Sequence, residues 1–293
     1  MPITQTGGFF FVWTVVQAVQ APADEGSRRV KSLLIFGCGN MGGAMLAGWL
    51  ASDLALRITV VDPLVHEVPA EVRLLRQVPA EQFDAVLLGI KPQSLGEAAP
   101  TLASALQPGT VLLSILAGAE LASLAGHFPL NGGIVRVMPN LAAAIGKAPI
   151  GLYGQVSDPV REQVSTLMAP LGSPEWLARE ADLDAVTALA GSGPAFVYRF
   201  IDALATSGAA LGLDPAQAER LALRMVEGAA ALAAAAGETP AELARRVTSP
   251  GGTTAAGLAV LDADGAFQRV LVETIRAAAQ RGAELAAAAR GET

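Results

Sequence analysis

The stretch LLIFGCGNMG, residues 33–42, places four apolar residues directly before glycines at positions 37, 39 and 42. A G-x-G-x-x-G spacing can arise by accident, but between a strand and a helix it is typical of dinucleotide-binding domains. The first glycine permits a tight turn, the second lets a pyrophosphate approach the backbone, and the third lets the helix pack on the strand. The phosphates would then bind N–H groups at the start of the helix. We therefore predict cofactor binding by Gly37, Gly39, Asn40, Met41 and Gly42.

The length and composition of the chain indicate two domains and a small ligand. A chain of 293 residues is long for a single hydrophobic core. Apolar residues make up 52% of it but aromatic residues only 5%, so alanine and aliphatic side chains dominate and favour closely packed helices. The 27 acidic residues outnumber the 20 lysines and arginines, which form no basic stripe. This distribution argues against nucleic acid and against an anionic membrane as partners.

Cysteine and histidine are scarce in this sequence. Cys38 is the only cysteine, so no disulfide can form within the chain, and we expect a cytoplasmic, reducing compartment. The two histidines, His66 and His127, have no second histidine or cysteine at ligand spacing. We therefore expect no metal site, and we interpret Cys38 as a small loop residue rather than a nucleophile.

Residues 1–31 stand apart from the rest of the sequence. Their apolar run, Phe9–Val19, is too short to span a bilayer, and no lysine or arginine precedes it as in a signal peptide. We expect neither a membrane anchor nor export. Our hypothesis is a disordered extension, or sequence translated upstream of the true start. The first domain then covers residues 32–180 and the second covers residues 181–293.

From Ser32 onward, strand-like and helix-like segments alternate, which is typical of a parallel sheet covered by helices. The first strand begins near Lys31, and the further strands are expected at residues 57–61, 84–90, 111–116, 134–138 and 174–177. We therefore predict a Rossmann-type, doubly wound α/β domain at the N-terminal side of the chain.

Several residues follow these strands at the edge where ligands of such sheets bind. Asp62 lies 20 residues past the third glycine, where an acidic residue commonly hydrogen-bonds the adenosine ribose and disfavours a 2′-phosphate. Its position favours NAD, although an acidic turn residue before Pro63 would give the same sequence. Lys91 directly follows a buried strand and is placed to meet the cofactor. Asn140 follows another strand at the same edge.

Beyond the first domain, the alternation gives way to consecutive helices. Pro194 restarts a helix after a glycine-rich interruption, because proline is tolerated in a first turn. Asp214 and Pro215 cap the next helix, which is expected to stop at Gly237. A capping box at Thr239–Glu242 opens another. The alanine-rich faces of these helices indicate helix–helix packing, and we expect a second subunit to take part in it.

A second glycine-rich turn, SPGGTT at residues 249–254, leads into an apolar helix. Its hydroxyls and glycine N–H groups lie at the start of that helix, an arrangement suited to binding a carboxylate. A plain turn with a serine or threonine cap is the alternative.

Five segments together resemble the pyrroline-5-carboxylate reductase family. They are GCGNMGGA at 37–44, GIKPQ at 89–93, VRVMPN at 135–140, DAVTALAGSGPAF at 184–196 and VTSPGGTTAAGL at 247–258. The first is shared with many dehydrogenases, whereas the last two are specific to this family. The resemblance extends from Ser32 to Glu284 in the family's order. Two departures, Leu141 in place of threonine and Phe196 in place of tyrosine, concern the positioning of the substrate.

The resemblance implies the last step of proline biosynthesis, in which a hydride from NADPH or NADH reduces the imine carbon of 1-pyrroline-5-carboxylate. It also implies a homodimer, which could assemble further, whose helical domains interlock and complete the active site. Thr254 and Ser249 would be the catalytic pair, with Thr254 near the ring nitrogen. The substrate carboxylate would be bound by Ser249, Gly251, Gly252, Thr253 and Thr254. The nicotinamide half of the cofactor would be lined by Lys91, Pro92, Ala117, Asn140 and Glu180. Members of this family often use NADPH, whereas Asp62 favours NADH.

Two other functions make different predictions. A hydroxyacid dehydrogenase would need a lysine or histidine as acid or base among the helices, and residues 184–261 contain neither. A nucleotide-sensing or scaffold protein would bind the cofactor without turnover and could lose the SPGGTT and GSGPA turns. Hydride transfer to an imine chiefly requires that two rings be oriented and a carboxylate anchored, which agrees with the residues present.

Overall fold

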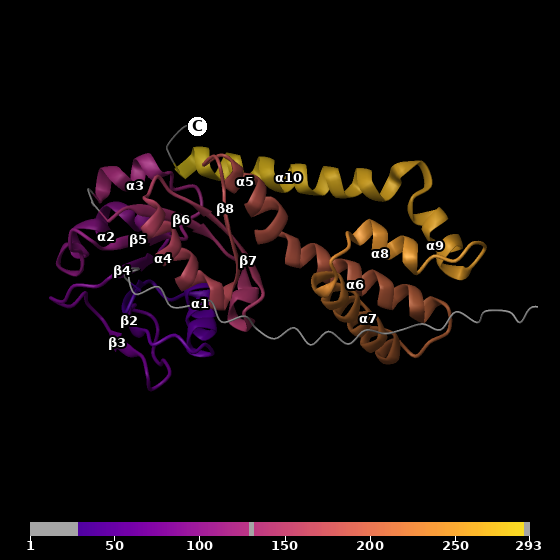
Figure 1. Cartoon of the computed structure of the whole chain (residues 1–293), viewed down its shortest axis with the longest axis horizontal. Helices are drawn as coiled ribbons and strands as arrows, with labels where there is room; N and C mark the ends of the chain where they lie inside the picture. Colours follow the sequence, from indigo (N-terminus) through magenta and orange to yellow (C-terminus); the bar gives the residue numbers. More distant parts are fainter. Residues whose placement is uncertain (1–28, 129–131, 290–293) are drawn as a thin grey trace, which may run out of the picture.

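The computed structural model describes residues 29–128 and 132–289, so the hypothesis for residues 1–31 falls almost wholly outside the described residues. An α/β region built on one sheet comes first, and a region of consecutive helices follows it (Figure 1). This is the predicted architecture. None of the helices in the described ranges has the length and apolar character needed to cross a membrane.

One sheet forms the centre of the α/β region, in the strand order β3-β2-β1-β4-β5-β6-β7-β8. Neighbours are parallel except for β6 and β7, which are antiparallel. The chain starts in the middle, runs outward to β3 and returns to β4, so the sheet is doubly wound with its switch point between β1 and β4. The strands are β1 (Ser32–Phe36), β2 (Arg57–Val61), β3 (Arg73–Leu75), β4 (Ala85–Leu88), β5 (Val111–Ser114), β6 (Ile134–Met138), β7 (Ala148–Tyr153) and β8 (Gly172–Trp176).

Helices cover both faces of this sheet. On one face, α1 (Asn40–Leu50) and α4 (Asp158–Met168) pack against the strands. On the other face, α2 (Leu95–Thr101) and α3 (Leu121–His127) do the same. Short 3-10 turns connect these elements, namely η1 (Pro92–Ser94), η2 (Ala103–Ala105), η3 (Leu141–Ile145) and η4 (Ala169–Leu171).

The helix that follows the glycine-rich loop is held firmly in this core. Trp49 of α1 is buried, and its indole Nε1 donates a hydrogen bond to the carbonyl oxygen of Leu167 in α4 at 2.8 Å. Gly48 lets α1 approach η3 closely, since a Cβ there would lie 2.2 Å from the carbonyl oxygen of Ala143. The first turn of α1 is therefore positioned by rigid packing behind it.

Two strands, β3 and β7, were not expected from the sequence. β3 spans only Arg73–Leu75, too short for a recognisable alternation. β7 contains Pro149, and proline within a run argues against a strand. In the structure Pro149 pairs with Ser173 of β8, whereas β7 pairs with β6 only from Gly151 onward, so the missing N–H of Pro149 interrupts no bond to β6.

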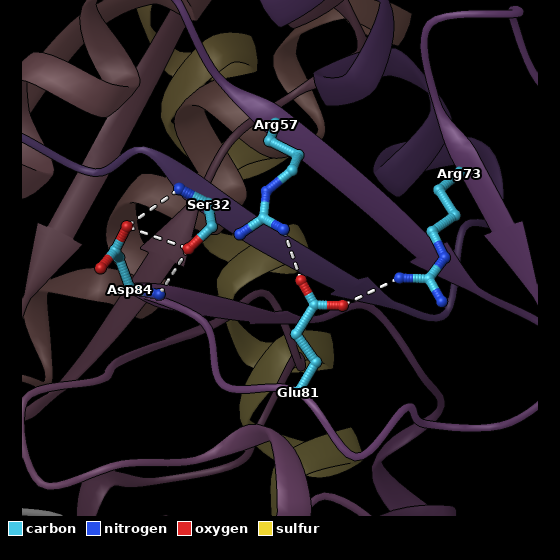
Figure 2. A network of polar contacts seen from close by, with 5 residues as sticks. All are labelled: Ser32, Arg57, Arg73, Glu81 and Asp84. Carbon is cyan, nitrogen blue, oxygen red and sulfur yellow. Dashed lines mark hydrogen bonds and ion pairs between the residues drawn. The ribbon is translucent and has the colours of Figure 1, made fainter.

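Polar side chains tie the amino ends of four strands together (Figure 2). Glu81, in the loop before β4, accepts hydrogen bonds from Arg57 of β2 at 2.5 Å and from Arg73 of β3 at 2.8 Å. Asp84 accepts from the Ser32 hydroxyl at 2.9 Å and from its backbone N–H at 3.0 Å. These contacts hold the amino ends of β1, β2, β3 and β4 together, at the edge opposite to the one where ligands of such sheets bind.

The helical region begins with α5 (Asp182–Val186) and a π-helical turn, η5 (Thr187–Gly191). Three predicted features are confirmed: Pro194 lies in the first turn of the next helix, Asp214 caps the helix after it, and Thr239 and Glu242 form a capping box. The last helix, α10 (Ala266–Ala289), contacts α5 and η5 at the start of the helical region, and its final turns lie beside the α/β region (Figure 1). The remaining elements are α6 (Gly193–Ala210), α7 (Pro215–Ala235), α8 (Pro240–Arg246), α9 (Thr253–Leu261), η6 (Ala263–Gly265) and α10 (Ala266–Ala289).

The helical region has almost no core of its own. α6, α8 and α9 contain no buried residue, and α7 buries only Ala218 and Ala222. Among the described residues, all but three of the exposed large apolar side chains lie in this region. Such a surface is typical of one half of an obligate interface.

Candidate active site

The register of the sheet brings four loop residues together at its carboxyl edge. Phe36 pairs with Val61 and with Leu88, and Val61 pairs with Leu75. The next residue of each strand therefore lies at one level, and these residues are Gly37, Asp62, Arg76 and Gly89. Ligands of doubly wound sheets bind at this edge, beside the switch point.

The glycine-rich loop has the geometry of a phosphate cradle. Gly37 has a φ of +89°, and a Cβ there would lie 2.8 Å from the carbonyl carbon and oxygen of Gly89. Gly42 packs just as tightly, since its Cβ would lie 2.9 Å from the carbonyl oxygen of Gly37. A Cβ at Gly39 would meet nothing within 4 Å. The outer glycines thus shape the loop, while the middle one faces open space at the start of α1.

The first turn of α1 has no side-chain cap, and Asn40 is exposed while Met41 is half-buried. The N–H groups of a helix start carry partial positive charge and bind anions when no side chain caps them. This arrangement fits the pyrophosphate of a dinucleotide.

Asp62 is buried at the carboxyl end of β2, and backbone groups engage both of its carboxylate oxygens. Oδ2 accepts from the N–H of Cys38 at 2.7 Å, and Oδ1 accepts from Leu64 at 2.7 Å and Val65 at 3.1 Å. Burial raises the pKa of this carboxyl, but the three N–H donors and the charge of Arg76 outweigh it, so the pKa is lowered overall. The carboxylate of Asp62 therefore binds the glycine-rich loop to the turn after β2.

The loops after β4 and β5 line the same edge. Lys91 is exposed in extended backbone directly before Pro92, which starts η1. Ala117 is exposed in the turn after β5, next to Gly118 with a φ of +75°. The side chain of Lys91 and the backbone near Ala117 are accessible to a ligand there.

Asn140 joins the two regions of the chain. Its side-chain oxygen accepts from the N–H of Ala142 at 2.9 Å and so caps η3. Its amide nitrogen donates to the carbonyl oxygen of Ala190 in the π-helical turn at 3.0 Å. Asn140 is buried, and through these bonds it fixes the helical region against the end of β6.

Glu180 lies where the α/β region meets the helices. Its Oε1 accepts from the guanidinium of Arg136 at 2.8 Å and from the N–H of Leu121 at 2.7 Å. The Arg136 side chain, on β6, is only 8% exposed. A cavity of about 340 Å³ adjoins this pair, lined by Gly118, Glu120, Arg136, Glu180, Ala181, Asp184 and Ala283.

The SPGGTT turn lies between α8 and α9, at the opposite end of the molecule from β2 and β4 (Figure 1). Gly251 has a φ of +68°, and the N–H of Gly252 donates to the carbonyl oxygen of Ser249 at 3.0 Å. Thr253 and Thr254 are exposed in the first turn of α9, which has no side-chain cap. One chain therefore does not bring this turn to its own glycine-rich loop.

Three residues at these sites were missed in the sequence. Gly89 shapes the first loop through its contact with Gly37, and its place in GIKPQ was the available signal. Arg76 follows a strand that was not predicted. Arg136 belongs to the VRVMPN segment, but its role could not be predicted because its partner, Glu180, lies 44 residues away.

Comparison with known proteins agrees with this arrangement of domains. Residues 32–118 match the family model of coenzyme F420-dependent NADP oxidoreductases, and residues 180–285 match that of the pyrroline-5-carboxylate reductase dimerisation domain. A dinucleotide fold joined to such a domain defines an NAD(P)-dependent oxidoreductase. A pyrroline-5-carboxylate reductase of Pseudomonas aeruginosa is 37% identical over 264 residues, 87% of this chain and 96% of the relative. The chain belongs to the pyrroline-5-carboxylate reductase family.

Other relatives extend the likeness over the same length. A reductase of this name from Aquifex aeolicus is 35% identical, over 86% of this chain and 96% of the relative. The solved structure of a Coxiella burnetii pyrroline-5-carboxylate reductase superposes with a TM-score of 0.80 at 25% identity, covering 88% of this chain and 99% of that one. The Plasmodium falciparum enzyme with NADP bound superposes at 0.72 and 25% identity, over 88% and 98%. The family resemblance inferred from the motifs is confirmed.

Proposed function

We propose that this protein is a pyrroline-5-carboxylate reductase that produces L-proline in the last step of proline biosynthesis. A reduced nicotinamide supplies the hydride, which adds to the imine carbon of 1-pyrroline-5-carboxylate. The C=N π bond breaks, and the ring nitrogen keeps the proton of the iminium form. The observation that carries the proposal is the pair of uncapped helix starts, one in each region of the chain, each preceded by a glycine-rich turn.

The first of these turns would bind the cofactor. The open space at Gly39 and the uncapped start of α1 suit a pyrophosphate. Lys91, Pro92 and Ala117 would border the nicotinamide from the loops after β4 and β5. Asn140 and Glu180, whose side chains are engaged in protein contacts, would hold the walls of this half of the site.

The second turn would bind the substrate. Ser249, Gly251, Gly252 and Thr253 surround the start of α9, where the helix dipole and backbone N–H groups favour a carboxylate. The hydroxyl of Thr254, exposed in the same turn, would lie near the ring nitrogen. The protein would thus orient the imine and anchor its carboxylate, and the transfer needs no strong acid or base.

The two turns would meet in a homodimer. Their separation within one chain, the unburied apolar faces of the helical region and the match to a dimerisation domain all support a site completed by a second subunit. We propose cytoplasmic location on the grounds already given, namely the single cysteine of the sequence.

The first test is oxidation of NADPH and of NADH by the purified protein, with 1-pyrroline-5-carboxylate as the added substrate. Turnover with either cofactor supports the proposal. Cofactor binding without turnover would contradict it and would favour a nucleotide-sensing protein or another imine as substrate.

Replacing Thr254 tests its assigned role. We expect Thr254→Ala to lower kcat/KM for the imine by about a hundredfold, since a group aimed at the reacting atoms is lost, while cofactor affinity stays close to wild type. Thr248→Ala is the matched control, because the Thr248 hydroxyl, just beyond the end of α8, donates to the carbonyl oxygen of Ala244 in that helix. Equal kinetics in the two variants would refute the role of Thr254.

A further inference from the structure

The adenosine end of the predicted cofactor site is built differently from what its sequence indicates. Asp62 occupies the position at which an acidic residue selects NAD by binding the ribose hydroxyls. In the structure the residue is 8% exposed, and its carboxylate accepts three backbone hydrogen bonds. The group that would reject a 2′-phosphate is therefore largely withdrawn from the surface and bound to the protein itself.

A positive charge lies directly beside it. Arg76 follows β3, and the pairing of Leu75 with Val61 sets Arg76 next to Asp62 at the carboxyl edge. The Nη1 of Arg76 donates to the carbonyl oxygen of Asp62 at 2.8 Å and to that of Val65 at 2.5 Å. These two bonds hold the guanidinium over the turn that follows β2.

The rest of this guanidinium is available to a ligand. Arg76 is exposed, and within the described part of the chain both of its hydrogen bonds to protein use Nη1. A guanidinium has five N–H donors, so Nε and Nη2 can still bind an anion, and their fork matches the oxygens of a phosphate. Leu64, in the same turn, is 81% exposed and offers an apolar face for a base.

We propose that Arg76 binds the 2′-phosphate of NADPH and makes this protein selective for NADPH over NADH. The inference rests on the proposed function only in naming the reduced cofactor. Asp62 serves as a structural link between the two loops, and Arg76, which is bonded to the backbone of the turn after β2, presents its remaining donors to the phosphate.

Binding of two nucleotide fragments tests this without any turnover. The full-length protein is titrated with 2′,5′-ADP and with 5′-AMP in a calorimeter. Because the two fragments differ only in the 2′-phosphate, the difference in affinity measures the contribution of that phosphate to binding. Wild type is expected to bind 2′,5′-ADP the more tightly. Arg76→Gln is expected to weaken 2′,5′-ADP by at least about tenfold, the range for lost hydrogen bonds to a charged group, with 5′-AMP changed less than about twofold.

Two further variants control for charge and for folding. Arg73→Gln removes the same charge from β3, but Arg73 pairs with Glu81 at the opposite edge (Figure 2), so both fragments should bind as in wild type. Arg76→Lys keeps the charge without the fork and should bind 2′,5′-ADP better than Arg76→Gln does. Unchanged 5′-AMP affinity in each variant shows that the site is folded.

Three outcomes of the titrations overturn the inference. They are equal wild-type affinity for the two fragments, an Arg76→Gln variant whose preference is unaltered, and a loss of 2′,5′-ADP binding in Arg73→Gln as large as in Arg76→Gln. Steady-state kinetics with 1-pyrroline-5-carboxylate distinguish a failure of the proposed Arg76 role from a failure of the proposed function. Arg76-dependent binding of 2′,5′-ADP without reduction of the imine would refute the function alone, and reduction that prefers NADH would refute the role of Arg76 alone.

Discussion

The ion pair between Arg136 and Glu180 offers a sharp test of how the two regions of the chain are joined. Glu180→Ala would leave the guanidinium of Arg136, 8% exposed, without its carboxylate, and would remove the acceptor for the N–H of Leu121. Breaking a buried pair from one side costs about 3–5 kcal/mol. Because the Glu180 side chain is 28% exposed, water can reach part of the space, and we expect a cost near the lower end, about 3 kcal/mol.

Thermal unfolding measures this cost. For a chain of this size, about 3 kcal/mol corresponds to a fall in Tm of about 5 °C, compared at equal protein concentration because a dimer gains stability by mass action. Asp182→Ala is the matched control. It breaks the neighbouring Arg179–Asp182 pair, in which Arg179 is 77% exposed, and it should leave Tm unchanged within error.

A double variant completes the test. Glu180→Leu combined with Arg136→Met removes both charges together, and it should recover most of the lost stability because no charge is left buried alone. A Glu180→Ala variant as stable as Asp182→Ala would refute the reasoning, since Arg136 would then not depend on this carboxylate.

Three other predictions concern the glycine-rich loop and Asp62, which is bonded to it. Gly39→Ala should leave the Tm unchanged, because the added Cβ meets nothing within 4 Å. The same Cβ would occupy space meant for the pyrophosphate, so the affinity for NADPH and for NADH should fall by at least about tenfold in titration calorimetry. Gly37→Ala should instead lower stability by about 2–4 kcal/mol in urea unfolding, since it adds a close contact at positive φ; the opposite pattern would contradict these assignments. Asp62 has a lowered pKa in the folded protein, so its contribution is present above the unfolded value of about 3.9 and is lost as pH falls through the folded value. The stability difference between wild type and Asp62→Asn should therefore shrink below about pH 4, and a difference independent of pH would argue against the lowered pKa.

The sequence predicted the architecture because its strongest signals are local. The turn at Gly37, the caps at Asp214 and Thr239 and the alternation of strands each depend on residues that are close in the chain. The strands that were missed lack such signals. β3 is only three residues long, and the proline in β7 lies where that strand pairs with β8 but not with β6.

The site was harder to predict because side chains that are placed to meet a ligand also form hydrogen bonds to other parts of the protein. Asp62 lies at the carboxyl end of the second strand, as predicted, but its carboxylate accepts hydrogen bonds from three N–H groups of two loops. Asn140 and Glu180 likewise bond to segments 50 and 44 residues away. Such long-range hydrogen bonds depend on how the whole chain packs, so no local sequence pattern predicts them.

The distance between the glycine-rich loop and the SPGGTT turn has a consequence for inheritance. If each working site takes one loop from each subunit, damage to the two loops is separable between copies. A subunit with a defective first loop and a subunit with a defective second turn would together form one intact site in a mixed dimer. Two alleles that are each inactive would then complement one another in the same cell.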